Sequence, residues 1–171
     1  MHRDIKLDNI LLDGKGRVKI ADFGVSKTVK KGEIMKEQSG TPAYIAPEII
    51  RDKGYKGFKA DMWSAGVVLF ALLYGTVPFK ANNMKDLHQQ IMDARYNMKD
   101  EISEPAKNLI RSLLNTDPKE RFSVTQVLQH EWMAGVEFIS KDIFNAEEKE
   151  VIRSEFTYND PSRFNRNERI R

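Results

Sequence analysis

The chain has 171 residues, of which 40% are apolar and 31% are charged, and its 28 Lys and Arg against 25 Asp and Glu give a formal net charge of +3. This length suits one domain or one lobe of a larger enzyme, and the composition excludes a chain that is disordered throughout. The sequence contains no cysteine, which excludes disulfides and cysteine-bound metals.

The same figures bear on partners and location. The basic excess is mild, so we expect no nucleic-acid partner, which would require a clustered basic face. No apolar run approaches the roughly 18 residues that a membrane span needs, so we expect no membrane partner. The N-terminal sequence MHRDIKLDN is charged where a signal peptide is apolar. We therefore expect an intracellular, cytoplasmic protein.

The first regular structure in chain order is a predicted strand pair. Residues 10–12 and 18–20 are apolar or alternate in polarity, and Asp13-Gly14-Lys15-Gly16 between them is typical of a turn. Residues 25–60 are polar, with Gly, Pro and Lys scattered along them, and predict a long loop with a short helix near 47–51. Loops of this length in compact domains are usually functional or disordered.

The next predicted element is a buried helix over 62–74. Its sequence is apolar on nearly every side, which is typical of a helix enclosed by other elements. We expect Asp61 to open this helix as its N-cap and Gly75 to end it as its C-cap.

Three more helices are predicted after it. Apolar residues at helical spacing indicate helices over 84–95 and from 103 onward. A capping box of Ser123 and Gln126 opens a fourth, whose apolar side chains we expect to be buried.

The remaining residues differ in composition. An acidic helix is expected over 146–156, followed by an arginine-rich tail. We therefore divide the chain into a folded lobe over 1–133 and a C-terminal extension over 134–171, which is either the start of a regulatory segment or a helix packed on the lobe.

Three short motifs stand in order: His2-Arg3-Asp4 with Asn9 five residues after the aspartate, then Asp22-Phe23-Gly24, then Ala46-Pro47-Glu48. Together they resemble the signature set of eukaryotic protein kinases, with Ile5 where the catalytic-loop pattern has Leu. The run from Tyr74 to Phe79 is similar to the calcium/calmodulin-dependent kinase group. The resemblance covers roughly residues 2–133.

The resemblance implies a fold and an activity. The fold is mainly α with a small β-hairpin, a protein-kinase-like C-lobe with the N-lobe absent. The activity is that of a Ser/Thr protein kinase, which transfers the γ-phosphoryl group of ATP to protein hydroxyls with Mg²⁺. One alternative is a non-catalytic kinase-like lobe that binds partners, and another is a regulatory fragment that competes with a full kinase for substrate.

The resemblance also assigns the catalytic residues. Asp4 would orient the substrate hydroxyl and accept its proton, and Lys6 would offset charge on the transferred phosphate. Asn9 and Asp22 supply oxygen atoms, which suit Mg²⁺ and through it the nucleotide. A lysine at position 6 is similar to Ser/Thr-specific kinases, and Thr41 would contact both Asp4 and Lys6.

Further residues carry structural expectations. Glu48 would form a buried ion pair with Arg121, and Asp61 would accept hydrogen bonds from the backbone of the catalytic loop. Arg3 and Lys27 would both bind Glu37, which stands three residues before Gly40, where related kinases carry a phosphorylated residue. Two alternatives stay open: a solvated Glu37, and a phosphate on Ser39 or Thr28, of which Ser39 is the stronger rival because it adjoins Gly40.

The upstream half of a kinase domain is not in this sequence. It lacks a Gly-rich phosphate loop, the V-A-I-K lysine and the helix that precedes the HRD motif. We expect a fragment, a truncated gene model or one piece of a swapped or assembled structure, whose partners are a protein substrate and either the missing N-lobe or a partner chain. The uncovered helix over 62–74 should then expose apolar surface and make the chain associate.

Overall fold

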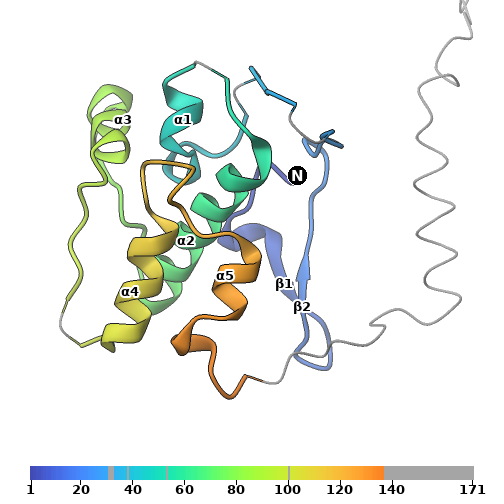
Figure 1. The fold of residues 1–171 in the computed structure, drawn as a ribbon, viewed down its shortest axis with the longest axis vertical. Helices are drawn as coiled ribbons and strands as arrows, with labels where there is room; N and C mark the ends of the chain where they lie inside the picture. The colour runs from blue at the N-terminus through green and yellow to red at the C-terminus, as the bar shows by residue number, and fades with distance from the viewer. Residues whose placement is uncertain (31–32, 38, 53, 100, 137–171) are drawn as a thin grey trace, which may run out of the picture. The chain divides into compact units, whose positions relative to one another are not determined.

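The computed structural model describes residues 1–30, 33–37, 39–52, 54–99 and 101–136 (Figure 1). The chain divides into two compact units, Met1–Ala134 and Gly135–Arg171, and the elements below all belong to the first. The acidic helix expected over 146–156 and the tail lie outside the described residues. Among the residues described, no helix combines the length and hydropathy needed to cross a membrane.

The described unit is mostly helical with one small sheet. A 3-10 turn, η1 (Leu7–Asn9), leads into β1 (Ile10–Leu12), which pairs antiparallel with β2 (Val18–Ile20). Two short helical pieces follow, η2 (Pro42–Tyr44) and α1 (Pro47–Ile50). The remaining elements are helical: α2 (Gly57–Tyr74), α3 (Met84–Met92), α4 (Glu104–Leu113), α5 (Val124–Leu128) and η3 (Glu131–Met133).

The hairpin forms because its turn is held by one carboxylate. Asp13 accepts hydrogen bonds from the backbone N–H groups of Lys15 and Arg17, each at 2.9 Å, and from the Arg17 side chain at 2.6 Å. These bonds lower the pKa of Asp13 to about 2, with the backbone bond from Arg17 as the main cause. The predicted strands and turn are confirmed, with Leu12 opposite Val18.

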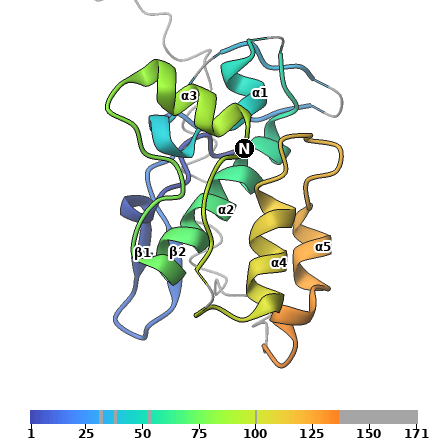
Figure 2. The ribbon, with the colours of Figure 1, turned by 90° about the vertical axis from the view of Figure 1, so that its left-hand side faces the viewer.

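Helix α2 is the centre of the unit and lies between the hairpin and α4 in both views (Figures 1 and 2). Trp63 and Val67 on it are fully buried. At Gly66 a Cβ would lie 2.7 Å from the Cβ of Leu113, so the glycine allows α4 to approach closely. The predicted C-cap is confirmed, because Gly75 is left-handed and its N–H donates to Ala71.

The start of α2 differs from the prediction. The helix begins at Gly57 with Lys56 as its N-cap residue, so Asp61 lies inside the helix and is not its cap. Neither Lys56 nor Gly57 is a helix-start signal, because Lys56 supplies no capping oxygen and glycine disfavours helix.

The later helices also differ in detail. Helix α3 ends at Met92, three residues before the predicted end, and Ala94 beyond it has a positive φ of 47°. The capping box of Ser123 and Gln126 is confirmed. The expected burial of α5 is wrong, since Val124 is 59% exposed and Leu128 is 47% exposed.

Exposed apolar side chains gather on the hairpin and its flanks rather than on α2. We call this set the hairpin patch; its members are Leu7, Leu11, Leu12, Val18, Ile20, Phe23 and Val25. Leu11 and Leu12 are adjacent on β1, so they point to opposite faces, and both are more than half exposed. On α2, by contrast, Leu72 is the exposed member of the predicted apolar stretch 62–74.

Candidate active site

The catalytic-loop motif converges on the carboxylate of Asp4. Its Oδ1 accepts hydrogen bonds from the N–H of Thr41 at 3.0 Å and from the Thr41 hydroxyl at 2.9 Å. Its Oδ2 lies 2.9 Å from Nζ of Lys6, and Lys6 also donates to the Thr41 hydroxyl at 3.1 Å. The Asn9 amide donates to the backbone oxygen of Asp4 at 2.8 Å. These four side chains therefore form one connected cluster.

The Asp4 carboxylate is ionised at neutral pH. Burial tends to raise the pKa of Asp4, but hydrogen bonds from Lys6 and Thr41 outweigh it, so the pKa lies below its ordinary value of 3.8. A carboxylate in this state can accept a hydrogen bond from a hydroxyl that reaches it.

The loop that carries Asp4 is fixed by helix α2. The two carboxylate oxygens of Asp61 accept hydrogen bonds from the backbone N–H groups of His2 at 2.8 Å and Arg3 at 2.9 Å. Arg3 has a positive φ of 73°, a conformation that costs of order 1–3 kcal/mol in a non-glycine residue. Asp61 is the fifth residue of the rigid helix α2, so it can hold this strained backbone in place.

Asn9 and Asp22 are brought together by the hairpin register. Ile10 pairs with Ile20, and the N–H of Ala21 donates to the backbone oxygen of Asn9 at 2.8 Å. Asp22 follows directly, with a positive φ of 60° and its Oδ1 accepting from the N–H of Gly24 at 3.2 Å. Because Asn9 uses its amide N–H₂ on Asp4, its side-chain oxygen is left to bind a cation.

The side chains of Asn9 and Asp22 suit a magnesium ion whose other ligands are phosphate oxygens and water. Within the described residues, no group of three or more His, Asp or Glu side chains is arranged to hold a metal. Mg²⁺ commonly binds one or two protein carboxylates and completes its shell with phosphate and water. The donor set of Asn9 and Asp22 matches that mode.

The segment before Thr41 is held by a charged cluster around Glu37. Its Oε2 lies 2.6 Å from Nη1 of Arg3, and its Oε1 lies 3.7 Å from Nζ of Lys27. Lys27 also lies 3.9 Å from Glu33. The hydrogen bond from Arg3 and then the charge of Lys27 lower the pKa of Glu37. We call Arg3, Lys27 and Glu37 the Glu37 clasp.

Sequence reasoning missed two residues that hold the same segment. Met35 is 2% exposed and pairs with Tyr55 through two backbone hydrogen bonds of 2.9 Å. The Tyr55 hydroxyl donates to the backbone oxygen of Glu37 at 2.9 Å. The apolar pair Ile34-Met35 within a polar loop was the available signal, since an apolar residue there suggests an anchor in the core.

Two neighbours complete this region. Ser39 is half-buried and lines a small hollow beside Asp4. Gly40 has a φ of 121°, and a Cβ on it would lie 2.9 Å from the backbone oxygen of Arg3. The glycine therefore allows the segment to pass directly against the catalytic loop.

Behind the site, Glu48 and Arg121 form a bidentate ion pair at 2.7 and 2.8 Å. Arg121 is fully buried, lies over the ring of Trp63 at 5.1 Å, and donates to the backbone oxygen of Asn115 at 2.9 Å. The pair joins α1 to the loop after α4, which fixes the end of the segment that begins near Thr41.

The profile of the protein kinase domain family matches residues 1–133. The chain belongs to the protein kinase family. It is 45% identical over 134 residues to CBL-interacting protein kinase 3 of Oryza sativa subsp. japonica, an alignment that covers 77% of this chain and 30% of that protein. It is 42% identical over 132 residues to Serine/threonine protein kinase OSK3 of Oryza sativa subsp. indica, covering 77% of this chain and 26% of that protein.

The first relative is named a protein kinase and the second a serine/threonine protein kinase, in agreement with the resemblance to the calcium/calmodulin-dependent kinase group drawn from Tyr74 to Phe79. The chain spans less than a third of the length of these relatives. The family generally acts on proteins with ATP and Mg²⁺.

Proposed function

We propose that this chain is the C-terminal lobe of a Ser/Thr protein kinase, which phosphorylates protein hydroxyls once the rest of the domain is supplied. The observation that carries the proposal is the Asp4 carboxylate held between Lys6 and Thr41, at 2.9 and 3.0 Å. A structural aspartate does not need both a lysine and a hydroxyl gathered around it.

The roles follow from the chemistry of phosphoryl transfer. The substrate hydroxyl oxygen forms a bond to the γ-phosphorus, the bond from that phosphorus to the leaving ADP oxygen breaks, and Asp4 accepts the hydroxyl proton. Lys6 offsets the negative charge that develops on the transferred group. Thr41 keeps Asp4 and Lys6 in one arrangement.

The nucleotide would be held through Asn9 and Asp22. Their oxygen atoms would bind Mg²⁺, which supplies neutralisation of the phosphate charge. The Gly-rich loop and strand lysine that cover ATP phosphates in this family do not occur among these 171 residues. We therefore expect the chain by itself to turn over negligibly.

A second candidate is a non-catalytic lobe that binds a partner chain. The observation that favours it is the hairpin patch, whose apolar side chains are exposed on both strands. The same surface would be covered in a complete enzyme by the missing N-lobe, so the two candidates differ in what happens when that part is restored. A regulatory fragment that competes for substrate would bind peptide but would transfer no phosphate after the N-lobe is added.

The deciding experiment restores the missing part. This chain is fused behind the N-terminal part of the kinase domain of CBL-interacting protein kinase 3, and phosphate transfer to a mixed protein substrate is measured. Asp4→Asn should reduce turnover by about 100-fold or more while ATP affinity stays nearly unchanged. Asp22→Asn should weaken Mg·ATP binding as well, because that carboxylate would be a metal ligand.

The control is Asp52→Asn, a change of the same kind at an exposed residue that follows α1. A folded, ATP-binding fusion with no transfer, or one in which Asp4→Asn retains turnover, would favour the non-catalytic candidate. Circular dichroism of each variant establishes that it is folded.

A further inference from the structure

One face of the β1–β2 hairpin is aliphatic along its whole length. Side chains alternate between the two faces of a strand, and residues paired across two strands share a face. The register therefore places four aliphatic side chains on one face, those of Ile10, Leu12, Val18 and Ile20. Leu12 is 69% exposed, Val18 63% and Ile20 49%, so most of this face is open. We call these four side chains the hairpin face.

The two ends of the hairpin carry opposite charge. At the turn, Arg17 is paired with Asp13 at 2.6 Å, whereas Lys15 is exposed and forms no ion pair in the described part of the chain. At the open end, Asp8 stands two residues before β1 and Asp22 two residues after β2, and both are exposed. The hairpin is therefore positive at its turn and negative at its open end.

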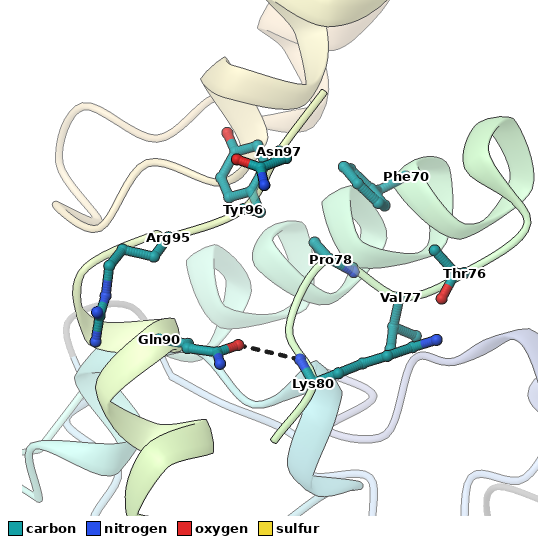
Figure 3. A pocket seen from close by; sticks show the side chains of 9 residues that line it. All are labelled: Phe70, Thr76, Val77, Pro78, Lys80, Gln90, Arg95, Tyr96 and Asn97. Carbon is teal, nitrogen blue, oxygen red and sulfur yellow. Dashed lines mark hydrogen bonds between the residues drawn. The ribbon is translucent and has the colours of Figure 1, made fainter. Parts of the chain in front are cut away.

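A hollow of about 650 Å³ where α2 ends has a different character, because charged and polar groups form part of its walls. Figure 3 shows Lys80 and Gln90 at one edge of it, Arg95 beyond Gln90, and Phe70 and Tyr96 on the other side. Two copies that met across this hollow would bring like charges together. Two copies that met through the hairpin face would bring together only aliphatic side chains.

The charges of the hairpin favour a second copy of the same chain as the occupant of this face. In a two-fold interface the same surface patch of both subunits meets, so the patch must be complementary to itself. Two hairpins that face each other in opposite directions place the turn of each over the open end of the other. Lys15 of one copy then approaches Asp8 and Asp22 of the second. Hairpins in the same direction would instead bring the two Lys15 side chains together.

We propose that two copies of this chain pack hairpin face against hairpin face, with their strands reversed, as a two-fold dimer. A two-fold axis that reverses the strands keeps β2 over β2, so Val18 of each copy lies over Ile20 of the other. The four side chains of a short hairpin cover less than the roughly 800 Å² per partner of a standard interface, so the dimer is weak and forms in the micromolar range. It does not depend on the proposed function, since Asp4 takes no part in it.

The first test measures the dimer and its loss. Sedimentation velocity of the full chain across the micromolar range gives the dissociation constant. Val18→Glu should raise this constant by about tenfold or more, because it sets a carboxylate against aliphatic side chains. The matched control is Val124→Glu, which makes the same change at a valine of α5 that is 59% exposed and lies outside the hairpin face. Circular dichroism shows whether each variant is folded, and Val18→Thr, which keeps the branched shape, tests the same contact if Val18→Glu is not.

The second test determines the direction of the strands by mixing variants. Val18→Glu mixed with Ile20→Lys should restore the dimer, because the new carboxylate meets the new ammonium while the other contact of Val18 with Ile20 stays intact. Val18→Glu mixed with Leu12→Lys should not, because those side chains meet only when the strands run in the same direction. A chain that stays monomeric, equal effects of Val18→Glu and Val124→Glu, or rescue by Leu12→Lys in place of Ile20→Lys would overturn the proposal. Asp4→Asn should dimerise as the wild type does, so an inactive restored enzyme would contradict the proposed function and leave this result standing.

Discussion

At the scale of single residues, Arg3 connects the catalytic loop to the segments on either side of it. Its backbone N–H bonds to Asp61, its guanidinium bonds to Glu37 and to the backbone oxygen of Val25, and its φ is positive. Arg3 is thus held in a strained conformation by partners from three parts of the chain. A substitution of Glu37 therefore removes a partner of Arg3, the residue directly before Asp4.

The first prediction at this scale is that Glu37 orders the activation segment without a phosphate. In the restored enzyme, activity should survive phosphatase treatment and fall several-fold in Glu37→Ala, because Arg3 then loses its carboxylate partner. Amide hydrogen exchange at Met35 and Thr41 should quicken in the same variant. Glu33→Ala is the control, because within the described residues Glu33 contacts Lys27 and the backbone N–H of Lys30 but makes no hydrogen bond or ion pair with Arg3.

The Glu37 clasp also has a defined pH dependence. The pKa of Glu37 lies below its ordinary value of 4.5, so the clasp is complete above that value and is lost as pH falls through the lowered pKa. An NMR titration of the Glu37 carboxyl in wild type and Arg3→Lys follows this directly. A titration at the ordinary value in both, or phosphate mapped to Ser39 with activity lost on its removal, would count against the clasp.

The sequence predicted which residues belong to the site better than it predicted the tertiary contacts that hold them in place. The roles of Asp4, Asn9 and Asp22 came from the resemblance and stay predictions, although the structure does join the side chain of Asn9 to Asp4. Tyr55 could not have been predicted from local pattern, because its contact with Glu37 joins positions 18 residues apart. Contacts of this kind depend on tertiary packing, which leaves no periodic signal in a single sequence.

At the scale of elements, α2 sets the position of everything around it. It presents Asp61 to the catalytic loop, Ser64 to η2, and Gly66 to α4. The apolar run 62–74 was sufficient to predict a central helix, but its true start at Gly57 has no capping residue and left no signal. The apolar positions of α5 likewise suggested burial, and they are exposed because the elements described around them do not cover that side.

The prediction at this scale concerns the contact of α2 with α4. Gly66→Ala should destabilise the chain by about 1–3 kcal/mol, because its Cβ would be forced to within 2.7 Å of Leu113. Gly14→Ala is the matched control, since a Cβ there meets nothing within 4 Å. Urea unfolding monitored by tryptophan fluorescence gives both values, and equal stability of the two variants would show that α2 and α4 can move apart without cost.

At the scale of the whole described unit, the buried pair of Glu48 and Arg121 joins residues 73 positions apart. Arg121 is 0% exposed and Glu48 is 8% exposed. Water therefore cannot solvate either charge if its partner is removed. The stability of the unit therefore depends on both ends of the pair being present together.

The prediction that follows compares single and double changes. Glu48→Gln or Arg121→Met should each cost about 3–5 kcal/mol of unfolding free energy, because each leaves one side of a buried ion pair uncompensated. The double variant should be more stable than the sum of the two losses implies. Arg111→Ala, which removes an exposed partner of Glu104 at 3.6 Å, should change stability by less than about 1 kcal/mol. Additive losses in the double variant would show that the two side chains act independently.

The ion pair also imposes an order on folding during synthesis. Glu48 leaves the ribosome long before Arg121 has been translated, and at about 5–20 residues per second the 73 residues between them take roughly 4–15 s. For that interval the carboxylate of α1 has no guanidinium to meet, so the segment that ends at α1 lacks the ion pair that fixes its end. Slowed translation between the two codons would lengthen the time for which this segment is held without its ion pair and can meet chaperones and proteases.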